Sequence, residues 1–175
     1  HPNDDINMSQ SSNDTFPTAL HISAVLVLED KVLPAIDTLV TTFKRLEKEN
    51  KGIVKSGRTH LQDAVPVSFS QEISGWRTSL ERDTEMIKSS LPYLKQLALG
   101  GTAVGTGLNA PKGFDKEVAK QVSELTGKKF VTAPNKYHAL TSKDELVYAH
   151  GALKALAADM MKIANDVRWL ASGPR

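Results

Sequence analysis

The sequence contains no cysteine, no long apolar run and little net charge. Without cysteine it forms no disulfide and performs no thiol chemistry. Its apolar runs are far shorter than the roughly 20 residues that a membrane-spanning helix needs. The 22 Lys and Arg residues against 20 Asp and Glu residues leave a formal charge of +2, so neither nucleic acid nor a membrane is expected as a partner.

The chain has 175 residues, which suits one domain or two small ones, and it begins with His1 rather than Met. We therefore expect it to be a piece of a longer protein. Apolar residues recur at intervals of three and four over most of its length, and we find no alternating strand of useful length. The predicted fold class is all-α, a bundle of long helices.

The first long helix is expected to follow a polar, turn-forming segment, residues 1–15. Pro17 suits the first turn of a helix, which predicts a cap a few residues earlier. The candidate caps are Asn13, Asp14 and Thr15. Residues 20–28 are apolar nearly all round and are expected to be buried on every side. Pro34 is expected to kink the helix.

Two further long helices each carry a seam, a line of apolar residues along one face. Such a seam favours packing against a partner helix at a shallow crossing angle. In the helix over about residues 68–98, Asp83 is the one charged residue among Phe69, Ile73, Trp76, Leu80, Ile87, Leu91, Leu94 and Ala98. The seam of the last helix is Leu146, Ala149, Leu153, Leu156, Met160, Ile163, Val167 and Leu170. Between them lie a glycine-rich loop, residues 100–107, expected to be a tight turn, and a short helix on Phe114, Val118, Val122 and Leu125.

The lengths of these helices point to self-association. A helix of roughly 30 residues is about 45 Å long, whereas a compact domain of this size has a radius of gyration of about 16 Å. We therefore expect an elongated molecule in which other copies cover residues 20–28. The simpler alternative is a monomeric helical bundle.

The run from Ser9 to Thr15 concentrates hydroxyl and amide side chains just before the first long helix. Free backbone N–H groups and the helix dipole attract anions at such a position, so a carboxylate ligand would fit there. An N-cap needs only one of these residues, and the run by itself favours this simpler role.

His60 is the candidate acid–base residue. It lies among polar neighbours in the segment Gly57–Asp63, and histidine is the side chain best suited to exchange protons near neutral pH. For a single loop histidine, a hydrogen bond to the backbone is the simpler interpretation. His21 and His150 are expected to be packed or half-exposed in helices, and His138 to lie in a loop without neighbouring carboxylates. No histidine pair has metal-ligand spacing, so no metal is expected.

Six segments, in this order, resemble class II fumarases, which belong to the fumarase/aspartase superfamily. The resemblance runs from His1 to Arg175 without interruption. The segments are His1-Pro2-Asn3-Asp4-Asp5-Ile6-Asn7, Ser11-Ser12-Asn13-Asp14, Gly57–Asp63, Gly100–Asn109, Ala133-Pro134-Asn135-Lys136 and the closing Met161–Arg168 with Ser172–Arg175.

The resemblance implies the central helical domain of this superfamily and a homotetramer whose active sites are each assembled from three subunits. It implies the reversible trans-hydration of fumarate to (S)-malate in the tricarboxylic acid cycle, without metal or organic cofactor. Residues 1–15 would be a polar substrate-binding segment, and residues 16–175 the helical bundle domain. The compartment would be the cytoplasm, or the mitochondrial matrix in a eukaryote.

The resemblance also implies roles for single residues. The residues that would bind a carboxylate of the dicarboxylate substrate are Ser11, Ser12 and Asn13. Thr59 and His60 would come from another chain, and His60 would be the catalytic acid–base partner that handles the added water. The residues that match the family's second dicarboxylate site, near the entrance, are His1, Asn3 and Asp4.

Two alternatives remain open. Aspartate ammonia-lyases resemble Gly-Arg-Thr-Gln-Leu-Gln-Asp where this chain has His60, and they tend to carry Ser-Thr in place of Ser11-Ser12. Since an ammonia-lyase has no water to activate, the histidine favours a hydratase. The second alternative is a non-catalytic helical scaffold, which has no need of a Ser-Ser-Asn run together with a Thr-His loop.

Tyr137-His138 departs from the Phe-Glu that is common in fumarases.

We predict that the 175-residue piece by itself does not hydrate fumarate. It offers neutral donors and one histidine, but no obvious lysine clamp for the developing negative charge and no mobile serine base. In the family these come from a Gly-Ser-Ser-x-Met-Pro-x-Lys-x-Asn loop, which would follow Arg175. The measurement is the loss of fumarate absorbance, and hydration by the purified piece would contradict the prediction.

Overall fold

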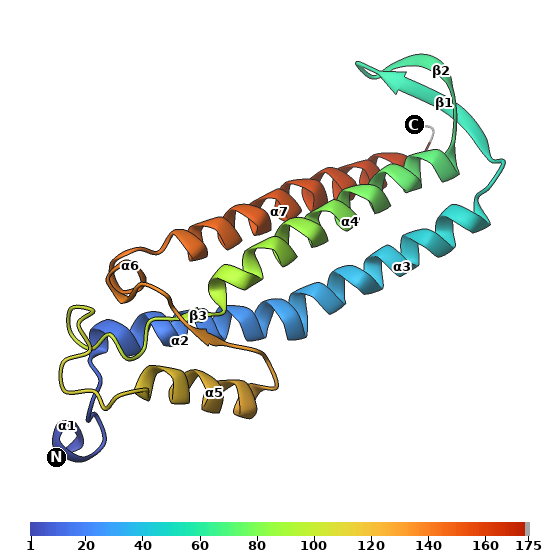
Figure 1. Cartoon of the computed structure of the whole chain (residues 1–175). Helices are drawn as coiled ribbons and strands as arrows, with labels where there is room; N and C mark the ends of the chain where they lie inside the picture. The colour runs from blue at the N-terminus through green and yellow to red at the C-terminus, as the bar shows by residue number, and fades with distance from the viewer. Residues whose placement is uncertain (174–175) are drawn as a thin grey trace. The chain divides into compact units, whose positions relative to one another are not determined.

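The computed structural model describes residues 1–173, apart from the side chain of Asn3 (Figure 1). The helices are α1 (Pro2–Asp5), α2 (Ser12–Val27), the π-helix η1 (Leu28–Val32), α3 (Leu33–Glu49), α4 (Phe69–Leu94), α5 (Phe114–Thr126), α6 (Lys136–Thr141) and α7 (Asp144–Leu170). The strands are β1 (Val54–Thr59), β2 (Gln62–Ser68), β3 (Gln96–Leu97) and β4 (Val131–Thr132). The predicted all-α class is confirmed. None of the described helices is long and apolar enough to cross a membrane.

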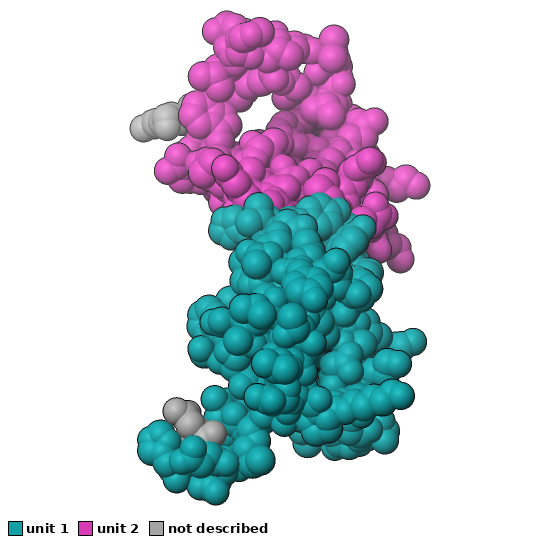
Figure 2. Space-filling model, turned by 60° about the vertical axis from the view of Figure 1, so that its left-hand side comes forward, with its two compact units in different colours: residues 1–31, 88–150 teal, residues 32–87, 151–175 magenta. Residues whose placement is uncertain are grey.

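The chain forms two compact units, coloured separately in Figure 2. The first unit consists of residues 1–31 and 88–150, and the second of residues 32–87 and 151 onward. Helices α4 and α7 each contribute residues to both units. The expected division after residue 15 stays a prediction.

Helix α2 begins earlier than the sequence predicted. Its N-cap is Ser11, whose hydroxyl accepts a hydrogen bond from the backbone N–H of Asn13. The backbone N–H of Ser11 in turn donates to Oδ1 of Asp14 at 2.9 Å. This reciprocal capping box outweighs the preference of Pro17 for the first turn, so the three predicted caps are wrong.

The apolar segment of α2 is buried on one side within the first unit. His21, Val25 and Leu28 are buried, whereas Val27 is 48% exposed. The residues of the single chain thus cover only one side of the helix, and cover of residues 20–28 by other copies stays a prediction. The expected irregularity near Pro34 takes the form of η1, which ends just before α3. A proline ring clashes with the carbonyl group four residues earlier, which disfavours a regular α-helix there.

The seam of α4 is confirmed, whereas the seam of α7 is only partly packed. The buried seam residues of α4 are Ile73, Trp76, Leu80, Asp83, Ile87, Leu91 and Leu94. Helix α4 ends at Leu94 rather than near residue 98, because β3 follows and pairs in parallel with β4. In α7, Ala149 and Ile163 are buried, but Val167 is 47% exposed.

The hairpin β1–β2 contradicts the expectation that the chain has no strand of useful length. Val54 pairs with Ser68 and Thr59 with Gln62 in an antiparallel register. Most of its residues are exposed, so neither face needs apolar side chains. Without one buried face a strand shows no alternation of apolar and polar residues, and the pattern that reveals strands is missing.

Asp83 is a buried charge in the apolar seam of α4. It is 1% exposed, and its Oδ2 is a buried oxygen without a hydrogen-bond partner among the described residues. Burial raises the pKa of Asp83, and the negative charge of Asp159 on α7 raises it further. The folded state therefore favours the protonated carboxyl group.

We predict that Asp83→Asn stabilises the protein at pH 7 and that the gain shrinks toward about pH 4. A carboxyl group whose pKa is raised by folding costs stability as the pH rises above its unfolded pKa, and the neutral amide removes this cost. Thermal unfolding of both proteins at the two pH values measures it. Asp37→Asn, an exposed position on α3, is the control. A wild-type protein that is the more stable at pH 7 would contradict the prediction.

Candidate functional site

The Ser11-Ser12-Asn13 run lies at the start of α2. Some hydrogen-bonding groups of its side chains are bonded within the chain, and others are available to a ligand. The hydroxyl oxygen of Ser11 accepts from the backbone N–H of Asn13 at 3.2 Å, and the hydroxyl proton is left to donate elsewhere. Ser12 is the first residue of α2 and is exposed. Nδ2 of Asn13 donates to the carbonyl oxygen of Ala103 at 2.8 Å. Since an amide has a second N–H and an acceptor oxygen, this bond orients the group without exhausting it.

The glycine-rich loop, residues 100–107, lies against this run. Its tight-turn prediction is confirmed: φ is +99° at Gly100 and +100° at Gly105. A Cβ atom on Gly100 would lie 2.4 Å from Cβ of Asp115, so no other residue fits there. The loop therefore packs backbone against neighbouring segments where a larger residue would hold them apart.

Thr59 and His60 lie at the tip of the β1–β2 hairpin. Thr59 pairs with Gln62, so His60 and Leu61 form a two-residue turn, with φ of +52° and +62°. This is the arrangement of a type I′ turn, which glycine and asparagine prefer. A residue of another kind costs about 1 kcal/mol or more in this conformation, and such strain persists mainly where function requires it. His60 is exposed, so its ring is accessible.

The hairpin is braced by a bulge and an ion pair. The register shifts between Ser56 and Arg58, at Gly57, where a Cβ atom would lie 2.6 Å from the carbonyl oxygen of Val65. Nε of Arg58 pairs with Oδ1 of Asp63 across the strands at 3.2 Å. These features fix the turn that carries Thr59 and His60.

A cavity of about 520 Å³ lies beside the hairpin in the second unit. Its charged lining residues are Lys55, Arg58, Glu72 and Asp166. Lys55 is already paired with Glu72 at 2.6 Å. With two cations against two anions, the charged lining of the cavity has no excess positive charge. Thr59 also lines this cavity, whereas Ser11, Ser12, Asn13 and His60 do not.

The described structure gives the predicted site as two separate parts. Ser11, Ser12 and Asn13 belong to the first unit, whereas Thr59 and His60 belong to the second. The predicted entrance residues lie in or beside α1. There the N-terminal amine of His1 pairs with Asp5 at 3.1 Å, Asp4 is exposed, and the side chain of Asn3 lies outside the described residues.

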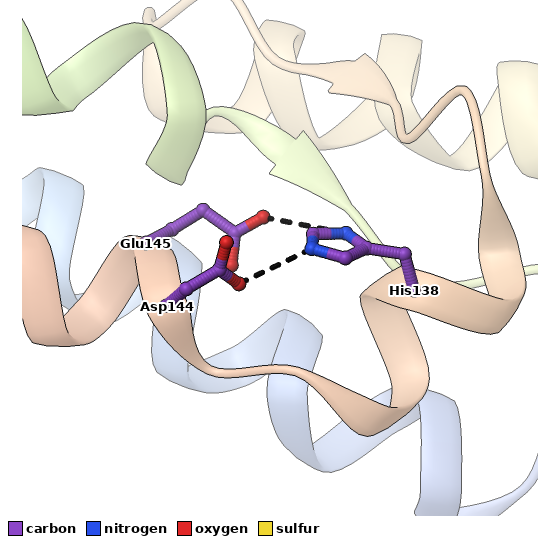
Figure 3. Close-up of side chains that lie close together, drawn as sticks. All are labelled: His138, Asp144 and Glu145. Atoms are coloured by element: carbon purple, nitrogen blue, oxygen red, sulfur yellow. Dashed lines mark ion pairs between the residues drawn. The ribbon is translucent and has the colours of Figure 1, made fainter.

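The prediction that His138 lies in a loop without neighbouring carboxylates is wrong. His138 lies in α6 rather than in a loop, and it does have carboxylate neighbours: its Nε2 lies 3.2 Å from Oδ1 of Asp144 and its Nδ1 3.8 Å from Oε1 of Glu145 (Figure 3). The two acids stand in the first turn of α7 and come near His138 only through the fold. A hydrogen bond from Ser142 and the charge of His138 help to lower the pKa of Asp144 to about 2.

These three side chains have ligand atoms within 4.8 Å of one another, as a metal site would require. However, each carboxylate already faces one ring nitrogen of His138, so the three side chains also fit an ion-pair network without a metal ion. The expectation of no metal stays a prediction. Of the other histidines, His21 is packed as expected, with Nδ1 3.0 Å from the carbonyl oxygen of Gln96, and His150 is exposed on α7.

Comparison with known proteins identifies the class. A family model described as a lyase matches residues 1–175, and the chain therefore belongs to this lyase family. Within the family it is similar to class II fumarate hydratases: it is 65% identical to that of Oceanobacillus iheyensis and 60% identical to that of Bacillus subtilis. Each alignment covers 100% of this chain and 38% of the relative. The chain thus spans less than half the length of the curated relatives it matches.

Solved structures agree with this assignment. The chain superposes on a class II fumarase from Schistosoma mansoni with a TM-score of 0.97 and 42% identity, covering 100% of this chain and 40% of that one. A fumarate lyase:delta crystallin from Brucella melitensis gives a TM-score of 0.93 at 36% identity, over 100% of this chain and 38% of its own. The resemblance to class II fumarases is confirmed.

We predict that Ser11→Ala lowers the free energy of unfolding by about 1 kcal/mol, because α2 loses its N-cap acceptor. Ser11→Asn keeps an acceptor and should restore most of the loss. Ser12→Ala, at the first helical position, is the control and should have little effect. Denaturant unfolding measures the three differences, and equal stability of the two alanine variants would contradict the prediction.

Proposed function

We propose that the full-length protein is a carbon–oxygen hydro-lyase that interconverts fumarate and (S)-malate. The observation that carries the proposal is His60, a histidine in a strained hairpin turn where asparagine or glycine would be favoured. The identity of 58–65% to class II fumarate hydratases supports it. The tricarboxylic acid cycle, and a cytoplasmic or mitochondrial location, belong to the same proposal.

The start of α2 would bind one carboxylate of the substrate. Ser11, Ser12 and Asn13 offer uncharged hydroxyl and amide donors, and they stand at the N-terminus of a 16-residue helix. The partial positive charge of a helix N-terminus favours an anion. Neutral donors stabilise a carboxylate without a competing ion pair, so substrate and product can both leave.

His60 would handle the water. In the direction of malate dehydration, a base takes a proton from the carbon next to one carboxylate, and a second proton must reach the departing hydroxyl group. Imidazole can give and take a proton near neutral pH, and Thr59 beside it offers a hydroxyl group to the substrate. The negative charge that develops on the carboxylate needs donors that are already in place.

The active site would be composite and the assembly a homotetramer, in which Thr59 and His60 meet the Ser11–Asn13 run of another chain. The exposed apolar residues of α7 support this assembly, since such residues need cover in water. Among the large apolar residues of α7, the largest exposed fractions are those of Val147, Met161 and Trp169, at 69%, 65% and 57%.

Two further parts of the proposal follow the sequence resemblance. His1, Asn3 and Asp4 would form a second dicarboxylate site near the entrance. The exposure of His1 and Asp4 is compatible with this role. No metal or organic cofactor is needed, because general acid–base catalysis with preorganised donors suffices for hydration.

The test uses the full-length protein and two substrates. Fumarate formation from malate supports a hydratase, whereas ammonia release from aspartate would assign an ammonia-lyase. Absence of both activities would leave the non-catalytic scaffold. The assays are the absorbance of fumarate and a coupled measurement of ammonia.

We predict that His60→Asn lowers kcat for malate by at least about a hundredfold, the scale of acid–base catalysis by one side chain. Asparagine suits the positive φ of the turn, so the hairpin and the assembly state should persist. His150→Asn, an exposed histidine on α7, is the matched control and should keep wild-type turnover. Undiminished turnover in His60→Asn would exclude His60 from catalysis.

A further inference from the structure

Asp14 is a fully buried carboxylate that binds three backbone N–H groups. Its Oδ1 accepts from Ser11 at 2.9 Å, and its Oδ2 accepts from Gly100 at 3.1 Å and Thr102 at 2.8 Å. Its side chain is 0% exposed. A buried charge is tolerated only when such bonds replace water. Asp14 therefore joins the start of α2 to a loop more than 80 residues away in the sequence.

Lys136, the first residue of α6, binds carbonyl groups of the attached loop segment, residues 97–103, which runs from the end of β3 into the glycine-rich loop. Its Nζ donates to the carbonyl oxygens of Leu97 and Leu99, each at 2.8 Å. Burial lowers the pKa of Lys136, whereas the negative charges of Asp115 and Asp14 raise it. Within residues 97–102, the ammonium group of Lys136 thus binds backbone carbonyl oxygens, and the carboxylate of Asp14 binds backbone N–H groups.

Two further bonds complete this attachment. The hydroxyl oxygen of Thr18, on α2, accepts from the backbone N–H of Leu99 at 3.0 Å. Nδ2 of Asn13 donates to the carbonyl oxygen of Ala103 at 2.8 Å. The start of α2 therefore forms hydrogen bonds with Leu99, Gly100, Thr102 and Ala103. These bonds restrict the movement of the loop relative to the Ser11–Asn13 run.

The attachment reaches the proposed substrate-binding groups directly. The Asn13 amide is oriented by Ala103, which follows the residues that Asp14 and Lys136 hold. Ser11 is held through its backbone N–H by Asp14, and its hydroxyl oxygen is oriented by the hydrogen bond that it accepts from the backbone N–H of Asn13. Three of the six segments that resemble class II fumarases thus meet around the buried carboxylate of Asp14 and the half-buried ammonium group of Lys136.

We propose that Asp14 and Lys136 are positioning residues for substrate binding, which lock residues 97–103 to the start of α2 and so aim the Ser11 hydroxyl and the Asn13 amide. This inference rests on the proposed fumarate hydratase function. Neither residue touches the substrate in this account. Both act through backbone groups, so their effect is expected on KM more than on kcat.

The test compares Lys136→Met with Lys143→Met in the full-length protein. Lys143 also donates to two carbonyl oxygens, those of Leu140 and Ser142, but neither is in the loop. Lys136→Met should raise KM for fumarate about tenfold with a smaller change in kcat, whereas Lys143→Met should leave KM unchanged. Lys136→Arg keeps the charge and the donors and should recover most of the affinity.

The carboxylate is tested by Asp14→Asn, with Asp83→Asn as the matched buried control. The amide of asparagine places its NH2 group either against the N–H of Ser11 or against the N–H groups of Gly100 and Thr102, so KM should again rise. Amide hydrogen exchange reads the attachment without reference to activity: Gly100 and Thr102 should exchange faster in Asp14→Asn and Lys136→Met, and at wild-type rates in the two controls.

The outcomes separate the inference from the function on which it rests. A wild-type protein that does not hydrate fumarate overturns both. An active wild-type protein with equal KM in Lys136→Met and Lys143→Met, or with unchanged exchange at Gly100 and Thr102, overturns the inference only. If Asp14→Asn does not fold, Lys136→Met decides. If both fail to fold, the two residues are structural and the proposal is wrong.

Discussion

The first unit depends on one buried carboxylate. Asp14 caps the backbone of Ser11 and binds the amides of Gly100 and Thr102, so it serves the start of α2 and the glycine-rich loop together. A carboxylate with three amide donors and no exposure tolerates little movement of any of them, since each lost bond leaves a buried polar group unpaired. The two residues whose amides it binds, Gly100 and Thr102, both have positive φ, and Gly100 lies close to Asp115.

The strained turn at His60, unlike the start of α2, is not held by buried hydrogen bonds to a distant loop. Strands β1 and β2 hold the backbone of this turn, through the bulge at Gly57 and the ion pair of Arg58 with Asp63. The side chain of His60 is exposed. The two halves of the proposed site thus differ in kind: donors fixed by buried bonds at α2, and an accessible imidazole on a projecting ribbon. This suits a reaction in which the carboxylate must be held still while protons pass to and from water.

The sequence predicted the elements that bury an apolar stripe and missed those that do not. The seam of α4, with Asp83 in it, followed from spacing, because burial of one helix face imposes a period near 3.6. The hairpin has no buried face and gave no signal. Side-chain chemistry marked the run from Ser9 to Thr15 and His60 as candidates, and the resemblance assigned their roles. The neighbours of His138 could not be predicted, since α6 and α7 bring them together in space.

The exposed hairpin also bears on how activity would depend on subunit concentration. A two-stranded ribbon with both faces in water is only marginally stable by itself, and the turn at its tip stores additional strain. Contacts from other subunits would therefore do more than supply missing groups: they would hold the ribbon in its active shape. If the proposed tetramer forms, dilution below its assembly constant would then lower turnover before the buried seam of α4 is lost.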